Sequence, residues 1–368
     1  MSCQATSGVI QRGAEGIRLS ESAFRGVSPW KHVLLRPLAA PGVSRMLAGL
    51  TETAATIFML HRFAVPELSI EGHSPAAVRE ILAALRKRRF EPISLHELFR
   101  RLKDGEPLRR AVAFTIDDGY FDHARVGAPV FAEFDWPATI FAVSGFLDGI
   151  TWLWWDKLSY LFTRTRRNAL TARLAGDEIP YVLDSMESRR RNAMDLNLRC
   201  QDASQVDRLA CLADLSREAD VELPAAPPPE FAPLTWDEAR QLEKRGITFG
   251  PHTVTHPVLS STGAEHAASE IAESWARLRA ELQYPVPVFA YPHGRRRDYG
   301  EREMAEVHRL GLLGGVSGHF DVFRPHLYRQ PPAICRVPRL GFRDDLLSVL
   351  QCVSGVEAVK ARLRGYRR

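Results

Sequence analysis

Residues 111–120 read Ala111-Val-Ala-Phe-Thr-Ile-Asp-Asp-Gly-Tyr120 and carry the strongest fold signal of the chain. The run Ala111–Ile116 is apolar apart from one threonine, which is typical of a strand buried on both faces of a parallel sheet. Asp117 and Asp118 follow directly, and the functional groups of parallel α/β proteins collect beyond the carboxyl ends of strands. Gly119 allows the backbone to turn tightly beneath a ligand. On this stretch alone, an ordinary Asp-Asp-Gly turn explains the pattern equally well.

Short apolar runs of this kind recur, separated by stretches of helical periodicity. One helix is predicted to begin at Ser74, since serine is a favourable N-cap and Pro75 suits the first turn. Further strands are predicted at Thr56–Leu60, Ala138–Val143, Ile247–Phe249, Val288–Ala290 and Leu313–Ser317, and a long helix at Ala264–Leu282. This alternation predicts an α/β fold, a parallel sheet covered by helices that is either doubly wound or a barrel.

The chain divides into a main domain with three additions. Residues 1–52 lack clear periodicity and are predicted to be an N-terminal extension, and residues 53–345 form the main domain. Within it, residues 150–230 depart from the strand–helix rhythm and are predicted to be a mainly helical insertion that ends at Pro227-Pro-Pro229. Residues 346–368 are predicted to form a basic C-terminal helix.

Composition excludes several classes of protein. With 368 residues, 45% hydrophobic and 25% charged, the chain is typical of a soluble globular protein, not of a disordered or disulfide-dense one. No charge-free apolar run reaches the roughly 18 residues of a transmembrane helix, and the first thirty residues lack a signal-peptide pattern. The five cysteines are scattered, which favours reduced thiols in a cytosolic setting. We therefore expect a cytoplasmic protein.

The net charge of +5 is unevenly distributed. Basic runs occur at Arg86–Arg89, Arg189–Arg191, Arg295–Arg297 and Lys360–Arg368. Solvated helix faces and a basic tail explain them, and no aromatic-interleaved basic stripe points to nucleic acid. At Val353–Arg368, apolar residues at helical spacing among basic ones fit either a docked terminal helix or peripheral contact with an anionic membrane.

A second chemical signal follows another predicted strand, in Gly250-Pro-His252-Thr-Val-Thr-His256. Two imidazoles four residues apart can point the same way and bind one divalent cation. Catalytic zinc has three protein ligands and keeps a position open for water or substrate, so one carboxylate of Asp117-Asp118 would complete a site. Taken alone, the histidine pair is also compatible with incidental spacing in a loop.

Together these motifs resemble the polysaccharide deacetylases of carbohydrate esterase family 4. The matching elements are Thr115–Gly119, His252–His256 and Phe289–Gly294, and the resemblance extends over roughly residues 55–345. Within that family, the chain most resembles the exopolysaccharide or poly-N-acetylglucosamine deacetylase subgroup. The resemblance implies a distorted (β/α) barrel with fewer than eight strands. It also implies metal-dependent removal of N-acetyl groups from N-acetylhexosamine units of a bacterial polysaccharide or glycolipid precursor. Two alternatives remain, a hydrolase of another non-peptide C–N bond and a catalytically silent glycan-binding protein.

The family pattern also implies residue roles. Asp118, His252 and His256 would hold the metal, most simply zinc, with cobalt or nickel as alternatives, and Asp117 would be the general base. The backbone N–H of His293 would stabilise the oxyanion. The remaining substrate-contacting positions implied are Gly119, Tyr120, Tyr291 and Pro292.

The sequence departs from the family pattern at two positions. These are the general acid and the arginine that usually holds the general base in place. No late Leu-x-His element is found, and the subgroup places its acid early, which favours His61 as the general acid. Ala290 occupies the usual arginine position, so Arg336 is predicted to brace Asp117 instead. Trp152, Trp154 and Trp155 either stack on sugar rings or pack the insertion against the main domain, and Asp156 and Lys157 are candidates for the rim of the cleft.

Overall fold

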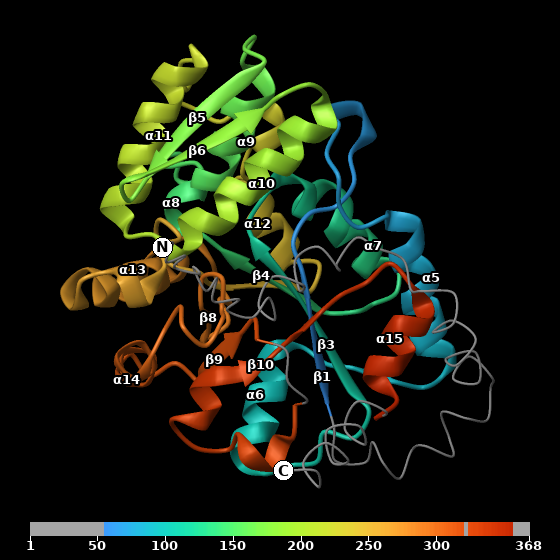
Figure 1. Ribbon diagram of the computed structural model, residues 1–368. Helices are drawn as coiled ribbons and strands as arrows, with labels where there is room; N and C mark the ends of the chain where they lie inside the picture. Colours follow the sequence, from blue (N-terminus) through green and yellow to red (C-terminus); the bar gives the residue numbers. More distant parts are fainter. Residues whose placement is uncertain (1–54, 320–322, 356–368) are drawn as a thin grey trace, which may run out of the picture.

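The computed structural model describes residues 55–319 and 323–355 (Figure 1). The N-terminal extension predicted for residues 1–52 and the basic end of the chain at 356–368 lie outside these ranges. No helix in the described part of the chain is both long and apolar enough to cross a bilayer.

The larger of two parallel sheets has the strand order β11-β1-β3-β4-β7, with β2 also paired to β3. Its strands are β1 (Thr56–Leu60), β2 (Glu91–Pro92), β3 (Ala111–Asp118), β4 (Ala138–Ala142), β7 (Ile247–Pro251) and β11 (Leu340–Gly341). Along β3 every residue is buried, which explains the uninterrupted apolar run. Successive side chains enter opposite cores, Phe114 one and Ala113 the other.

The second sheet adjoins the first along both edges. It contains β8 (Val288–Ala290), β9 (Gly314–Ser317) and β10 (Val337–Pro338), in the order β10-β9-β8. Only Arg339 separates β10 from β11, so the chain passes there from pairing with β9 to pairing with β1. On the other side, the N–H of Val286 donates to the carbonyl of Phe249 at 2.7 Å, but no ladder joins β7 to β8 in the described residues. The predicted α/β fold of parallel strands and helices is confirmed, and the two sheets do not close into a barrel between β7 and β8 in the described residues.

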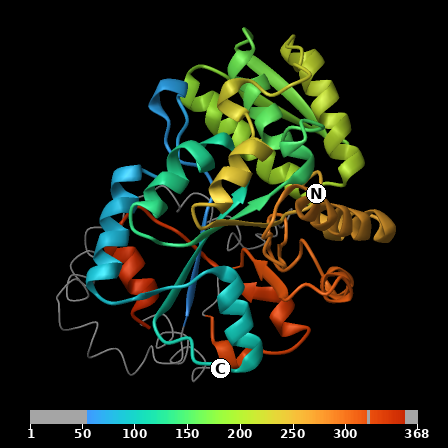
Figure 2. The same ribbon diagram turned by 180° about the vertical axis from the view of Figure 1, so that it is seen from behind.

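Helices cover both faces of these sheets (Figures 1 and 2). The helix predicted at Ser74 is confirmed, since the Ser74 hydroxyl accepts a hydrogen bond from the N–H of Ala77 and Pro75 begins the helix. The helices of the main domain are α5 (Pro75–Lys87), α6 (Leu95–Asp104), α7 (Ala128–Ala132), α8 (Ser144–Leu147), α12 (Trp236–Glu243), α13 (Ala264–Glu281), α14 (Glu301–Arg309) and α15 (Leu346–Val353). Short 3-10 segments lie at Pro66–Leu68, Pro229–Phe231, Leu259–Ser261, Pro325–Leu327 and Ala333–Arg336, and one π-helical turn at His123–Gly127.

The predicted insertion is a separate layer at the end of the sheet where the strands stop (Figures 1 and 2). Its helices are α9 (Trp154–Arg164), α10 (Met186–Asp202) and α11 (Gln205–Ala219), which share a core of their own. Between α9 and α10 the chain forms an antiparallel hairpin, β5 (Ala169–Leu174) with β6 (Asp177–Val182), which the sequence did not predict. The insertion is thus helical with one hairpin.

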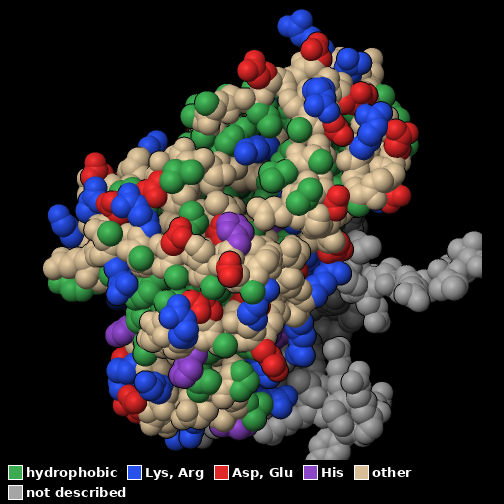
Figure 3. Space-filling model, turned by 90° about the vertical axis from the view of Figure 1, so that its left-hand side faces the viewer, with side chains coloured by type: hydrophobic (Ala, Val, Ile, Leu, Met, Phe, Trp, Pro, Cys, Tyr) green, Lys and Arg blue, Asp and Glu red, His purple; other side chains and the backbone are tan. Residues whose placement is uncertain are grey.

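Basic and acidic side chains are interspersed over the face of the molecule in Figure 3. The basic run at residues 295–297 illustrates this, because Arg295 and Arg297 both form ion pairs with Asp202 of the insertion, at 3.4 and 2.8 Å. Arg190, in another predicted basic run, pairs with Glu71 at 2.8 Å. These two runs therefore have acidic partners, as expected of solvated surface charge.

Candidate active site

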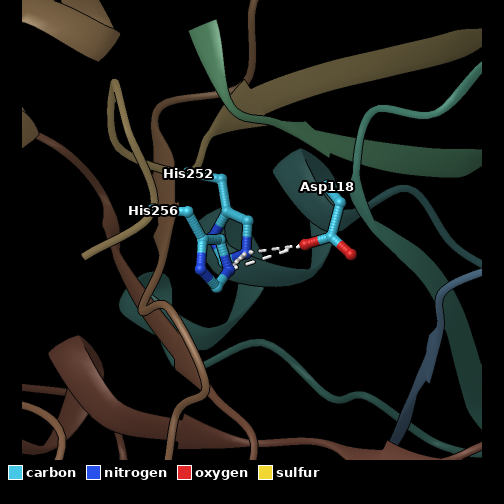
Figure 4. Close-up of side chains that lie close together, drawn as sticks. All are labelled: Asp118, His252 and His256. Atoms are coloured by element: carbon cyan, nitrogen blue, oxygen red, sulfur yellow. Dashed lines mark hydrogen bonds and ion pairs between the residues drawn. The ribbon is translucent and has the colours of Figure 1, made fainter. Parts of the chain in front are cut away.

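Two strand ends of the sheet bring the predicted metal ligands together. Asp118 is the last residue of β3, His252 directly follows β7, and His256 lies in the turn beyond it. Because these strands are parallel, their carboxyl ends meet at the same edge. Figure 4 shows the three side chains pointing at one another. All three are buried, at 5% exposure or less.

The ligand atoms form a compact triangle. The Nε2 atoms of His252 and His256 are 3.2 Å apart, and the Oδ1 atom of Asp118 lies 3.7 and 3.5 Å from them. With metal–ligand distances of about 2.0–2.2 Å, a tetrahedral ion places its ligands roughly 3.4 Å from one another. The triangle has the size required for three ligands of one ion, and within the described ranges it is the one such cluster of histidine, cysteine and carboxylate side chains.

The hydrogen bonds around the two imidazoles also suit a cation. The Nδ1–H of His252 donates to the carbonyl of Ala290 at 2.8 Å, which leaves a lone pair on its Nε2. Burial first, and then the neighbouring imidazoles of His252 and His293, hold the pKa of His256 well below its ordinary value. Neutral imidazoles are the form that binds metals. Two Nε2 atoms facing one buried carboxylate oxygen therefore fit a divalent cation between them.

Asp117 is braced by Arg339, not by Arg336. The Nη1–H and Nη2–H groups of Arg339 donate to Oδ1 and Oδ2 of Asp117 at 2.7 and 2.6 Å, and both side chains are buried. Burial alone would raise the pKa of Asp117, but the charge and hydrogen bonds of Arg339 outweigh it and lower the pKa to about 2. The base is therefore ionised at neutral pH. The prediction for Arg336 was wrong, because this residue ends a 3-10 segment and is exposed, whereas Arg339 lies between β10 and β11 and points inward.

Arg336 instead lines a separate cavity of about 400 Å³. Neither Asp117 nor any of the three metal-ligand candidates lines that cavity in the described residues.

His61 lies near enough to Asp117 and His256 to interact with them electrostatically. It follows β1 directly, is exposed, and adds to the lowering of the Asp117 pKa after Arg339 and His252. The next two residues are anchored by the buried carboxylate of Asp122, which accepts hydrogen bonds from Nε–H of Arg62 at 2.8 Å and from the N–H of Phe63 at 2.6 Å. The backbone that carries His61 is therefore fixed although its side chain meets solvent.

His293 occupies a turn beside the metal ligands. Its φ is +58°, and its N–H has no hydrogen-bond acceptor in the described part of the chain. The imidazole packs edge-to-face against His256, with ring centroids 4.9 Å apart, and its Nε2 is buried without a hydrogen-bond partner. Burial first, and then the charges of Arg295 and Arg208, keep the pKa of His293 well below its ordinary value.

Two predicted substrate contacts are internal instead. Tyr120 is 1% exposed, and its hydroxyl donates to Asp156 at 2.7 Å while it accepts from the indole N–H of Trp155 at 2.9 Å. Tyr291, also 1% exposed, stacks on Tyr299 with centroids 3.9 Å apart. We therefore correct the assignment of both side chains from substrate contact to packing.

Gly119 and Pro292, the other two predicted substrate contacts, shape the backbone around the site. Gly119 has a φ of +94°, and a Cβ there would lie 2.8 Å from Leu147, so glycine is required for the turn itself. Pro292 is buried, and its carbonyl accepts a hydrogen bond from the N–H of Gly294.

The tryptophans at the start of the insertion divide into two kinds. Trp152 and Trp154 are buried in apolar clusters, which is the packing role. Trp155 is half-buried, and its ring lies 4.7 Å from that of His256 and 6.1 Å from that of His293. Trp155 therefore forms a wall of the site. Its neighbour Asp156 is buried and off the rim, and burial raises its pKa to about 7 although the charge of Arg62 opposes the shift.

Lys157, the other candidate for the rim, is also drawn inward. Its ammonium lies 5.7 Å from the ring centroid of Trp152, and burial lowers its pKa.

The fold and this site define an α/β domain with a candidate three-ligand metal site beside a carboxylate that an arginine braces. Residues 206–312 match the family model of polysaccharide deacetylase. The matched segment contains His252, His256 and His293. Asp117 and Asp118 lie outside it, and geometry alone joins them to the histidines.

Individual relatives agree with the family. A segment of 74 residues is 34% identical to poly-beta-1,6-N-acetyl-D-glucosamine N-deacetylase of Escherichia coli strain K12. That match covers 20% of this chain and 11% of the relative, so the chain spans a small part of the curated protein that it matches. The fold resembles a Streptococcus pyogenes deacetylase, PplD, in complex with acetate (TM-score 0.53, 17% identity, 82% of this chain and 99% of that one). It also resembles IcaB from Ammonifex degensii (TM-score 0.52, 16% identity, 82% and 97%).

Proposed function

We propose that this protein removes N-acetyl groups from N-acetylhexosamine units of a bacterial polysaccharide or glycolipid precursor. The observation that carries the proposal is the ionised carboxylate of Asp117, fixed by Arg339 next to the Asp118–His252–His256 triangle. A base beside three metal ligands is the arrangement that hydrolysis of an amide requires. The name of the Escherichia coli relative supports an amino-sugar polymer as substrate.

We further propose that the metal is zinc, because two imidazoles and one carboxylate are ligands that zinc prefers. When bound, a divalent ion there would polarise the acetyl carbonyl and lower the pKa of water. The three buried ligands come from two strand ends and leave the remaining positions of a four-coordinate ion to water and substrate.

The chain's own residues supply the rest of the reaction. Asp117 accepts the proton of the attacking water, and Arg339 keeps the carboxylate ionised and aimed. The free N–H of His293 donates to the acyl oxygen as negative charge develops there. His61 protonates the departing amine, so that acetate and a free amino sugar leave. The exposed position of His61 at the rim suits this role, since the leaving group belongs to the bulky sugar.

Acetate release from N-acetylated glycans, with metal content measured on the same samples, tests this function. The metal-free protein should be inactive and should recover activity with zinc, cobalt or nickel. Asp117→Asn should keep the metal and lose at least about 100-fold in turnover. An exposed acid in the hairpin provides the matched control Asp177→Asn, which should be unaffected. Stoichiometric metal with no acetate from any glycan would favour the binding-protein alternative, and release of another amine product would favour a different C–N bond.

A further inference from the structure

The turn that carries two metal ligands is conformationally strained. Thr253 and His256 both have positive φ values, +66° and +59°, a region that side chains other than glycine rarely adopt. Such residues persist only where the surrounding structure fixes them, and they concentrate at functional sites. Because His256 is itself a ligand, its imidazole reaches the triangle only while this strained backbone is maintained.

The carbonyl side of the turn is held by the start of α8. The N–H groups of Ser144 and Gly145 donate to the carbonyls of Thr253 and Val254, at 3.1 and 3.0 Å. These bonds fix one edge of the turn. The amides of residues 254 and 255 need acceptors elsewhere, since a buried N–H without a partner is costly.

Those amides donate to a single buried side chain, Glu270 of α13. Its Oε2 accepts from the N–H of Val254 at 2.7 Å and from the N–H of Thr255 at 2.9 Å. Its Oε1 accepts from the Thr255 hydroxyl at 2.5 Å, and the imidazole of His266 lies 3.7 Å away. Glu270 is only 3% exposed. A buried carboxylate is stable only with such donors, so the turn and Glu270 stabilise each other.

We propose that Glu270 is a positioning residue of the metal site, which fixes the 252–256 turn in the conformation that presents both imidazoles to one cation. This inference rests on the proposed metal centre and extends it to a residue that touches neither metal nor substrate. Without Glu270, two partly buried amides lose their acceptor and the strained turn relaxes, which withdraws His256 from the triangle. Loss of Glu270 should therefore weaken metal binding.

The two conservative changes at this position separate placement from charge. In Glu270→Gln, the amide oxygen can accept from both N–H groups, and the NH₂ group can donate to the Thr255 hydroxyl oxygen. All three contacts survive and the charge is lost. Glu270→Asp keeps the charge but withdraws the carboxylate by one methylene. Glu270→Ala removes every contact. The exposed first-turn residue of α13 gives the matched control Glu265→Gln.

The experiment uses full-length protein stripped of metal, titrated with zinc against a chromophoric chelator and then with cobalt. The visible spectrum of cobalt depends on the number and arrangement of its ligands. We expect Glu270→Ala and Glu270→Asp to weaken zinc binding by at least about tenfold and to alter the cobalt spectrum, whereas Glu270→Gln and Glu265→Gln stay within about threefold of the parent. If Glu270→Ala does not fold, Glu270→Asp carries the test.

Two results would overturn the inference while leaving the proposed function intact. One is unchanged zinc affinity and cobalt spectrum in Glu270→Ala and Glu270→Asp. The other is an equal loss in Glu270→Gln, which would assign the effect to charge. A parent protein that binds no zinc at all would instead overturn both the inference and the metal-dependent function.

Discussion

Replacing Arg339 with methionine should destabilise the protein strongly, because it leaves a buried charge without its partner. Arg339 makes two charge-assisted hydrogen bonds to Asp117, at 2.7 and 2.6 Å, and a third bond to the Thr115 hydroxyl at 2.9 Å. Methionine fills much of the same space, so little of the cost comes from a cavity. Most of it comes from leaving the buried Asp117 carboxylate without a partner for its charge. Breaking a buried ion pair from one side typically costs about 3–5 kcal/mol, and we expect Arg339→Met to fall in that range.

The double variant distinguishes this explanation from loss of packing. Asp117→Asn combined with Arg339→Met removes both charges, and it should be at least about 2 kcal/mol more stable than Arg339→Met alone. The matched control is Arg336→Met, the same substitution at an exposed site three residues earlier, which should change stability by less than about 0.5 kcal/mol.

Guanidinium unfolding of the metal-free protein at neutral pH measures these differences. Fluorescence and circular dichroism should give coincident transitions, which is the condition for reading free energies from them. Zinc binding by Arg339→Met should persist, because all three ligands remain, while turnover is lost. A cost below about 1 kcal/mol for Arg339→Met, or a double variant no more stable than the single one, would refute the assignment of Arg339.

Other perturbations test neighbouring parts of the structure. Asp156 has a native pKa of about 7 against an ordinary 3.8, so its contribution to stability is complete below pH 3.8 and is lost as the pH rises through 7. This pH dependence of the free energy of unfolding amounts to about 4 kcal/mol between pH 3.8 and 7, and Asp156→Asn should remove it. Denaturant unfolding at several pH values measures it, and an unchanged pH dependence in the variant would assign the titration to another group. His61→Ala should lower acetate release from an N-acetyl sugar by at least about 100-fold but spare an activated aryl acetate, whose leaving group needs no proton. Equal losses on both substrates, or loss of metal, would make His61 structural or a ligand. Gly145→Ala should weaken zinc binding, because a Cβ there would lie 2.6 Å from the carbonyl oxygen of Val254; unchanged affinity would show that the turn tolerates the shift.

The strand framework and the metal ligands could be predicted because each depends on local sequence. A buried parallel strand needs a continuous apolar run, and Asp118, His252 and His256 follow such runs directly. Parallel strands then bring those residues to the same edge whatever the details of packing. The brace of Asp117 could not be predicted in this way. Arg336 and Arg339 lie only three residues apart, and which of them points inward depends on where the 3-10 turn ends and β10 begins.

Other features left no usable signal in the sequence. The β5–β6 hairpin turns at Ala175-Gly176, both with positive φ, whereas the usual hairpin signal is asparagine or aspartate before glycine. Glu270 is one of several acidic residues in a long helix, and nothing in the sequence separates it from the solvent-exposed ones. Only the tertiary structure shows that its carboxylate accepts hydrogen bonds from two backbone N–H groups of the 252–256 turn.

The position of Arg339 along the chain has a consequence for synthesis. All three metal ligands and the base precede residue 257, whereas the arginine that neutralises the base lies more than eighty residues later, where the second sheet passes into the first. A ribosome adding about 5–20 residues per second completes the segment with the ligands and the base seconds before it adds the arginine that neutralises the base. During that interval, burial of the Asp117 carboxylate would lack its guanidinium partner, so we expect the base to become buried only when the sheet edge closes. Shortened chains that end before β10 would retain every ligand and still lack a formed catalytic centre.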